Sequence, residues 1–341
     1  MKTRIVIGVS LSVVVLAMAN LFVSHAQQAV IRPSQAQPES QMIQPPKLDV
    51  GARLNPLKIA LLHWYLADTS TSVTVGSQPY GVCFDGANIW TANSGDNTVT
   101  KVQASTGQVL GTFKVGGLPY GVTFDGANVW VSNQADGTVT KLRAFDGKNL
   151  GTFAAGTFPS WMAFDGQNLW IPNSPSVGAG TVTKLRVGDG KILGSFGVGV
   201  GPIATAFDGS SVWVTNYGSA TVTKLRASDG TVLGTFGVGN GALGIAFDGA
   251  NMWIANRNGG TVTELRASDG AVLGSFSTPD GPYGIAFDGT YIWVTGDVYI
   301  FVLRASDGAQ VTFRQLQSEG VAFDGAYIWT AAQGGSRLLK F

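Results

Sequence analysis

The stretch Ile245–Asn256, which reads Ile-Ala-Phe-Asp-Gly-Ala-Asn-Met-Trp-Ile-Ala-Asn, decides the fold because close variants of it recur along the chain. Its Phe-Asp-Gly triplet occurs seven times, and a Trp stands six residues after each Phe. Successive triplets lie 40, 40, 43, 40, 40 and 36 residues apart, and such a period is typical of β-propeller blades. The triplets begin at Phe84, Phe124, Phe164, Phe207, Phe247, Phe287 and Phe323.

One unit of the repeat predicts four short strands that become more polar after the first two. A turn at Asp248-Gly249 joins the first two strands, and we expect type I′ geometry because Asp and Gly tolerate positive φ. A second Asp-Gly pair, Asp269-Gly270, joins the last two strands. The predicted strands are Gly244–Phe247, Asn251–Asn256, Thr261–Arg266 and Ala271–Phe276.

The two ends of the repeat region predict how the ring closes. The last unit, Gly320–Phe341, supplies only three strands before the chain ends. Thr71–Gly76 resembles the end of a fourth strand, Gly111–Gly116, and can complete that last blade. Closure of the ring removes exposed sheet edges. The sequence therefore predicts one all-β domain, a seven-bladed β-propeller over residues 71–341.

Composition excludes several classes of protein. Hydrophobic residues make up 45% and charged residues 13% of the 341 residues, which excludes a mostly disordered chain. The net charge is +1 and no basic run follows the amino end, so nucleic acid is not an expected partner. Cys83 is the one cysteine, which excludes an intramolecular disulfide and fits a small core position. The only histidines are His25 and His63.

The amino-terminal residues resemble an export signal followed by a tether. Residues 1–26 resemble a signal peptide, with Lys2 and Arg4 before an uncharged apolar stretch. That stretch is longer than usual, so an uncleaved membrane anchor remains an alternative. Residues 27–53 form a Pro-, Gln- and Ser-rich linker, and residues 54–70 predict a short helix and lead-in. We therefore expect a periplasmic, cell-surface or secreted protein, attached to the membrane only if the amino-terminal segment stays uncleaved.

Most of the repeated residues have structural explanations. The Phe and Trp of each unit are expected to pack blade against blade, and the Asp residues suit turns before Gly. The repeated Asn is expected to order the loop after the second strand through its side chain. It stands at Asn93, Asn133, Asn173, Asn216 and Asn256.

The units differ on one face only. The Asp-Gly turns lie at one end of every blade, and the connections that vary lie at the other end, where binding sites of repeat proteins tend to occur. Four residues before the Phe of a unit, or three in the third unit, several units carry an aromatic residue or a carboxylate. We expect these side chains to form an arc near the mouth of the central channel. These candidate ligand-binding residues are Tyr80, Tyr120, Trp161, Tyr283 and Glu319. Such rings suit a glycan, a peptide or another amphipathic ligand; alternatively, they only pack the links between blades.

A second group on the varied face consists of acidic residues. Asp280, Asp297 and Glu319 come from neighbouring loops of the sixth and seventh units. Three oxygen ligands could hold Ca²⁺ or Mg²⁺. The alternative is that they are solvated loop charges and that the protein has no cofactor.

The unit over Ile245–Gly270 resembles the repeat of the bacterial YVTN-type β-propeller family. The resemblance covers residues 71–341 and implies an exported or surface-associated propeller. Propellers related in fold include the streptogramin B lyases, which open a cyclic depsipeptide with histidines, a glutamate and Mg²⁺. Because residues 71–341 contain no histidine, the resemblance assigns no lyase residue to this chain.

Three functions remain open from the sequence. The first is a monomeric, non-catalytic extracytoplasmic module that binds a glycan, a peptide or an envelope protein through the varied face. The second is a metal-assisted lyase or lactonase, and the third is a structural component of the cell envelope. The missing histidines and the missing nucleophile–base pair favour the first and leave no residue predicted as catalytic.

Overall fold

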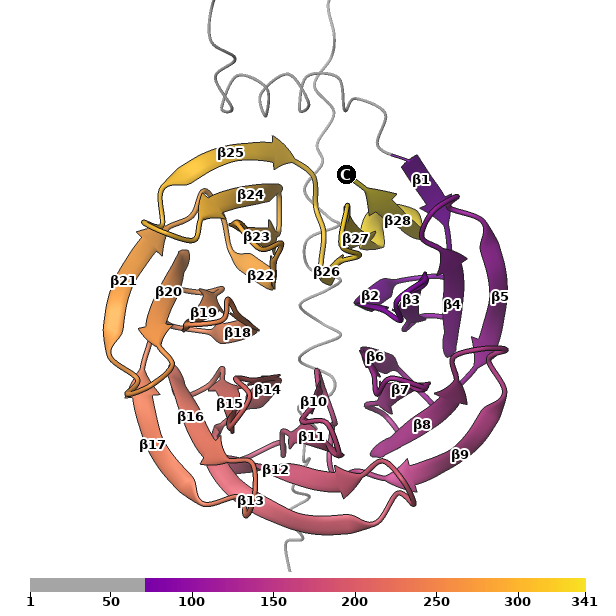
Figure 1. Cartoon of the computed structure of the whole chain (residues 1–341), viewed down its shortest axis with the longest axis horizontal. Coiled ribbons are helices and arrows are strands. Elements are labelled where there is room, and N and C mark those ends of the chain that lie inside the picture. The colour runs from indigo at the N-terminus through magenta and orange to yellow at the C-terminus, as the bar shows by residue number, and fades with distance from the viewer. Residues whose placement is uncertain (1–70) are drawn as a thin grey trace, which may run out of the picture. The chain divides into compact units, whose positions relative to one another are not determined.

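The computed structural model describes residues 71–341 as seven four-stranded antiparallel sheets arranged around a central axis (Figure 1). In six sheets the strands follow one another outward in chain order. This architecture confirms the predicted seven-bladed β-propeller. No helix in this part of the chain is long and apolar enough to cross a membrane. The predicted signal segment, linker and lead-in helix lie outside the described residues.

Each of the first four blades takes its strands from one stretch of the chain. Blade 1 comprises β2 (Pro79–Phe84), β3 (Asn88–Asn93), β4 (Thr98–Gln103) and β5 (Val109–Lys114), and blade 2 comprises β6 (Pro119–Phe124), β7 (Asn128–Asn133), β8 (Thr138–Arg143) and β9 (Asn149–Ala154). Blade 3 comprises β10 (Ala163–Phe164), β11 (Asn168–Asn173), β12 (Ala179–Arg186) and β13 (Ile192–Val200). Blade 4 comprises β14 (Pro202–Phe207), β15 (Ser211–Asn216), β16 (Thr221–Arg226) and β17 (Val232–Gly237).

The remaining blades follow in the same way, except that the last draws on both ends of the domain. Blade 5 comprises β18 (Ala242–Phe247), β19 (Asn251–Asn256), β20 (Thr261–Arg266) and β21 (Val272–Ser277). Blade 6 comprises β22 (Pro282–Phe287), β23 (Tyr291–Gly296), β24 (Tyr299–Arg304) and β25 (Gln310–Gln315). Blade 7 comprises β26 (Val321–Phe323), β27 (Ile328–Ala332), the 3₁₀ turn η1 (Gln333–Gly335), β28 (Arg337–Lys340) and, from the other end of the domain, β1 (Thr71–Thr74).

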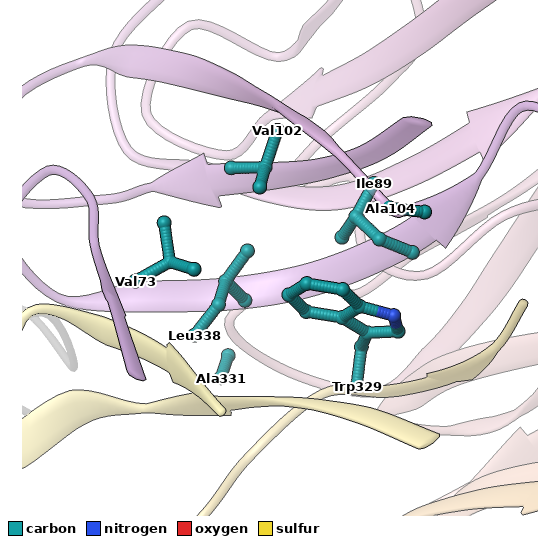
Figure 2. Packing of buried hydrophobic residues seen from close by; sticks show 7 residues of the cluster. All are labelled: Val73, Ile89, Val102, Ala104, Trp329, Ala331 and Leu338. Carbon is teal, nitrogen blue, oxygen red and sulfur yellow. The ribbon is translucent and has the colours of Figure 1, made fainter. Parts of the chain in front are cut away.

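The ring closes through β1. This strand pairs antiparallel with β28, with Val73 opposite Leu338. The Val73 side chain is 6% exposed and packs in one cluster with Trp329, Leu338 and Ile89, so it joins blade 7 to blade 1 (Figure 2). The expected completion of the last blade by the amino-terminal strand is confirmed.

The Phe-Asp-Gly turn differs from the predicted type I′ geometry. Asp248 N–H bonds the Asn251 carbonyl at 3.0 Å, so the two loop residues are Gly249 and Ala250, and of these Gly249 has the positive φ, 102°. Type I′ geometry needs positive φ at both loop residues, so this turn is not type I′. Asp248 keeps a negative φ because its carboxylate is occupied: Oδ1 accepts the Asn251 N–H, and Oδ2 accepts the Trp253 indole N–H at 2.7 Å.

The same Asp-to-indole bond occurs in every blade and explains the constant spacing between Asp and Trp. It satisfies the one polar atom of a ring that is otherwise buried between blades. The seven bonds join Asp85 to Trp90, Asp125 to Trp130, Asp165 to Trp170, Asp208 to Trp213, Asp248 to Trp253, Asp288 to Trp293, and Asp324 to Trp329.

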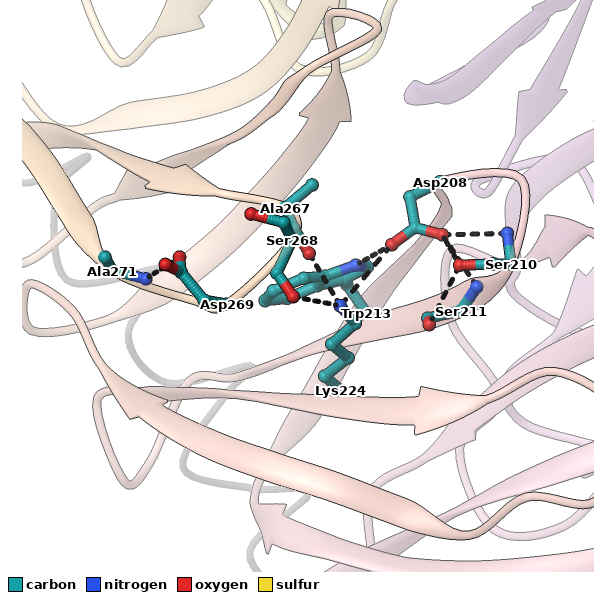
Figure 3. A network of polar contacts seen from close by, with 9 residues as sticks. All are labelled: Asp208, Ser210, Ser211, Trp213, Lys224, Ala267, Ser268, Asp269 and Ala271. Atoms are coloured by element: carbon teal, nitrogen blue, oxygen red, sulfur yellow. Dashed lines mark hydrogen bonds and ion pairs between the residues drawn. The ribbon is translucent and has the colours of Figure 1, made fainter.

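A lysine on the third strand links most neighbouring blades. In blade 4, the Lys224 ammonium donates to the Ala267 carbonyl of blade 5 at 2.6 Å and lies 4.8 Å from the Trp213 ring centroid (Figure 3). It is also 4.0 Å from Asp208 Oδ2. One cation therefore neutralises the turn aspartate, covers the indole and holds the next blade. Blades 1, 2, 3 and 7 have the same carbonyl and indole contacts, from Lys101, Lys141, Lys184 and Lys340.

Glycine lets the innermost strands approach one another around the channel. A Cβ on Gly244 would lie 2.3 Å from the Tyr283 carbonyl of the next blade, and one on Gly320 would lie 2.1 Å from the Tyr80 carbonyl. Trp161 stands at the equivalent place in blade 3. Trp161 therefore replaces the usual glycine at the end of the channel where the loops vary.

Candidate functional site

The five residues predicted from the sequence all lie at the start of innermost strands. Tyr80, Tyr120 and Tyr283 are second residues of β2, β6 and β22, while Trp161 and Glu319 shortly precede β10 and β26. These positions are at the varied end of the channel. The structure therefore brings all five residues to one region, which we call the channel mouth.

The aromatic rings form one continuous cluster. The centroids of Tyr80 and Tyr120 are 4.7 Å apart, and those of Tyr120 and Trp161 are 4.8 Å apart. Trp161 of blade 3 also meets Tyr283 of blade 6 edge to face at 6.4 Å. Blades 3 and 6 are not neighbours in the ring, so Trp161 closes the predicted open arc by reaching across the channel. The sequence did not predict this contact.

Backbone contacts fix the unusual position of Trp161. Its N–H donates to the Ile203 carbonyl at 3.0 Å, and its carbonyl accepts the Thr205 N–H at 3.0 Å. Trp161 thus pairs in parallel with blade 4 at Ala204, and only Ala163–Phe164 remains as β10. The indole is half-buried, which leaves part of its surface open to solvent.

Glu319 is the buried carboxylate of the channel mouth. The side chain is 5% exposed, and its Oε2 atom has no hydrogen-bond partner within residues 71–341. Burial is the main influence that raises the pKa of Glu319, to about 8; Asp297 raises it further, whereas Arg257 and a hydrogen bond from Tyr283 lower it. Glu319 is therefore mostly protonated at neutral pH.

An ion pair beside Glu319 was not predicted as part of the site. Arg257 Nη2 donates to Asp297 Oδ1 at 2.9 Å, and its guanidinium lies 4.4 Å from the Tyr283 ring centroid. Arg257 Nη1 also donates to the Tyr283 hydroxyl at 3.3 Å. A sequence signal existed: both ionic residues directly follow the second strand, in neighbouring units, where most units have an uncharged residue.

The three acidic residues predicted as metal ligands have separate roles in the structure. The Asp280 carboxylate accepts the backbone N–H groups of Val298 and Tyr299, so it orders its own loop. Asp297 pairs with Arg257, and Glu319 meets Tyr283. Across residues 71–341, no group of three or more His, Cys, Asp or Glu side chains is arranged to hold a metal ion.

A small cavity lies among the innermost strands. Its volume is about 110 Å³, and its lining includes Trp161, Thr205, Ile245, Ile285 and Val321. The lining is mainly aliphatic, with the Thr205 hydroxyl as its polar side chain. Trp161 belongs both to this cavity and to the aromatic cluster.

Cys83 lies in blade 1 at the edge of the core, where it is half-buried among apolar side chains. It packs against the cluster formed by Trp90 and Val122. Burial and the nearby Asp85 charge raise the pKa of the Cys83 thiol well above its usual range. The thiol is therefore a poor nucleophile.

Comparisons with known proteins show the fold. No family model and no curated protein sequence matches the chain. Among solved structures, a streptogramin B lyase superposes with a TM-score of 0.68 at 17% identity, covering 80% of this chain and 96% of its own. A hydrazine synthase from Kuenenia stuttgartiensis gives 0.69 at 18% identity, covering 80% and 98%. A functionally unknown protein from Desulfotomaculum acetoxidans gives 0.64 at 15% identity, covering 73% and 90%.

The three similar structures are two proteins named as enzymes and one protein of unknown function. At 15–18% identity they show the propeller architecture alone. Function must therefore be argued from the channel mouth. Residues 71–341 contain no histidine, so no imidazole base is present in the propeller.

Proposed function

We propose that this chain is a non-catalytic binding module that holds its ligand at the channel mouth. The observation that supports this most is a buried carboxylate with an oxygen, Glu319 Oε2, that lacks a partner within residues 71–341 and lies beside a continuous cluster of aromatic rings. Native proteins rarely leave such an oxygen without a partner. Partly exposed aromatic rings with polar tips are typical of sites for glycans and peptides.

Catalysis fits the same residues less well. A hydrolytic or lyase reaction needs a nucleophile or base in contact with an activating partner. The phenols of Tyr120 and Tyr283 have pKa values raised by burial, so they stay protonated at neutral pH. The acidic groups are occupied by Arg257, by backbone N–H groups or by a proton. A metal-assisted lyase or lactonase is the alternative, and a structural envelope component is the other.

The cellular location, family, oligomeric state and partner of the protein belong to the same proposal. The charged and apolar pattern of residues 1–26 supports export, either released after cleavage or held by an uncleaved segment. The repeat supports membership of the YVTN-type propeller family. The closed ring supports a monomer, because one chain supplies all four strands of every blade. The expected partner is a glycan, a peptide or an envelope protein.

A thermal-shift panel on the full chain separates the ligand classes. We expect a peptide or glycan to raise Tm and divalent cations alone to leave it unchanged. A ligand at 100 times its Kd stabilises the folded state by about 2.7 kcal/mol, which corresponds to a shift of about 5–10 °C for a domain of this size. A shift with Ca²⁺ or Mg²⁺ alone would contradict the proposal and favour the metal-assisted enzyme. No shift with any compound would favour the structural component.

A further inference from the structure

The charges at the channel mouth do not balance within the described part of the protein. Arg257 is paired with Asp297 at 2.9 Å, and the two side chains are 34% and 41% exposed. Glu319, which is 5% exposed, forms no ion pair within residues 71–341. Removing a carboxylate from water without a counter-ion is strongly unfavourable. The site therefore needs one more positive charge beside Glu319, supplied either by a proton or by a ligand.

The surrounding rings are suited to a ligand cation. The face of an aromatic ring attracts an ammonium or guanidinium group. The protein already uses this contact beside the site, where the Arg257 guanidinium lies 4.4 Å from the Tyr283 ring centroid. Tyr120 and Trp161 continue the cluster and are half-buried, so they can cover a cation or the methylene groups next to it.

The unpartnered oxygen selects among cations. Glu319 Oε2 needs a hydrogen-bond donor, which a quaternary ammonium lacks and a primary ammonium has. A neutral sugar could donate to that oxygen but would leave the missing charge unsupplied. A second guanidinium would be less suitable, because it is broader than an ammonium group and Arg257 already borders the site.

We propose that the channel mouth binds a primary alkylammonium group, such as a lysine side chain of a peptide, with its N–H groups on Glu319 and its methylene groups against Tyr120 and Trp161. This assignment rests on the proposed function and names its ligand class. In the bound state the ammonium takes the place of the proton that Glu319 holds in the free protein. One proton is released when the ligand binds below the pKa of the carboxyl group.

The groups around Glu319 make the pH dependence specific to it. The charged and titratable side chains around Glu319 are Arg257, Asp297, Tyr283 and Tyr120, together with Tyr80 of the neighbouring strand β2. Arg257 and Asp297 are ion-paired, and burial keeps the phenols of Tyr283 and Tyr120 protonated through neutral pH. With the pKa of Glu319 at about 8, the fraction of free protein ready for an ammonium ion increases between pH 6 and pH 8.5.

The test is a calorimetric titration of the full chain with Nα-acetyl-lysine amide, whose ammonium stays charged throughout this range. We expect Kd to decrease about 75-fold between pH 6 and pH 8.5, which follows from the ionised fraction of a group with a pKa of about 8. At pH 6, we expect the buffer dependence of the enthalpy to show about one proton released for each ligand bound.

Two matched controls isolate the charge. The Nα,Nε-diacetylated lysine amide, which is neutral, is expected not to bind. Glu319→Gln keeps the shape of the side chain and is expected to weaken binding at least tenfold at pH 8.5 and to abolish the pH dependence. Glu264→Gln changes the other glutamate of the propeller, which is buried in β20 and bonded to Asn251, and is expected to bind like the wild type.

The outcomes separate this inference from the proposed function. Equal binding of the neutral compound, unchanged binding by Glu319→Gln, or no binding of Nα-acetyl-lysine amide would each overturn the ammonium assignment. The binding proposal would nevertheless stand if another ligand binds the wild type and is lost in Trp161→Gly, a change that restores the residue of most sister blades. It would fall if such a ligand binds Trp161→Gly unchanged.

Discussion

Replacing Glu319 with Gln is expected to stabilise the propeller at pH 8 by several kcal/mol more than at pH 5. Burial raises the pKa of Glu319 from 4.5 to about 8 in the folded state. Between those values the folded protein keeps the proton and the unfolded chain releases it. The wild type therefore loses stability as pH rises through this window, by about 1.4 kcal/mol for each pH unit. Glutamine does not titrate, so the variant does not lose this stability as the pH rises.

Chemical denaturation at pH 5, 6, 7 and 8 measures this effect as the difference between variant and wild type. Asp146→Asn is a suitable control because the exposed Asp146 pairs with Arg143, which lowers the pKa of the Asp146 carboxyl below the window. Its difference from the wild type is expected to be constant across these pH values. A Glu319→Gln difference that is equally constant would show that the Glu319 carboxyl is ionised in the folded protein and that its pKa is not raised.

Replacing Val73 with Asp is expected to open the ring and to lower the unfolding free energy by about 3–5 kcal/mol. The substitution places an unpaired charge where Val73 packs between Trp329, Leu338 and Ile89. It also weakens the strand that joins the two ends of the domain through β28. For a domain of this size we expect Tm to fall by about 8 °C or more.

Thr74→Asp is the matched control for this substitution. Thr74 is the next residue of β1, is exposed and lies opposite Arg337, so the same charge meets water and a basic residue. Its Tm is expected to change by no more than about 2 °C. Equal effects of the two substitutions would show that β1 adds little to the stability of blade 7.

The repeat predicted the architecture because one regular feature, the spacing from Phe-Asp-Gly to Trp, reflects contacts inside each blade. The strands and the closure by Thr71–Thr74 follow from where that pattern begins and ends. The predicted turn type was wrong because positive φ is a local preference, whereas Asp248 is held by a hydrogen bond to the Trp253 indole. Turn propensities alone do not predict that hydrogen bond.

The sequence predicted which residues belong to the site but not how they are arranged in space. Comparing units placed Tyr80, Tyr120, Trp161, Tyr283 and Glu319 on one face. The contact of Trp161 with Tyr283 depends on the width of the channel, and the pairing of Arg257 with Asp297 depends on the angle between blades 5 and 6. Both distances are set by the packing of whole blades and not by the spacing of the residues along the chain.

The most direct test of the binding proposal is the affinity of the strongest ligand in the panel for three proteins: the wild type, Trp161→Gly and Phe145→Ala. Phe145 is 87% exposed in a turn on the uniform face and controls for loss of an aromatic ring away from the channel mouth. We predict at least tenfold weaker binding by Trp161→Gly and unchanged binding by Phe145→Ala. Unchanged binding by Trp161→Gly would contradict the proposal that the ligand is held at the channel mouth.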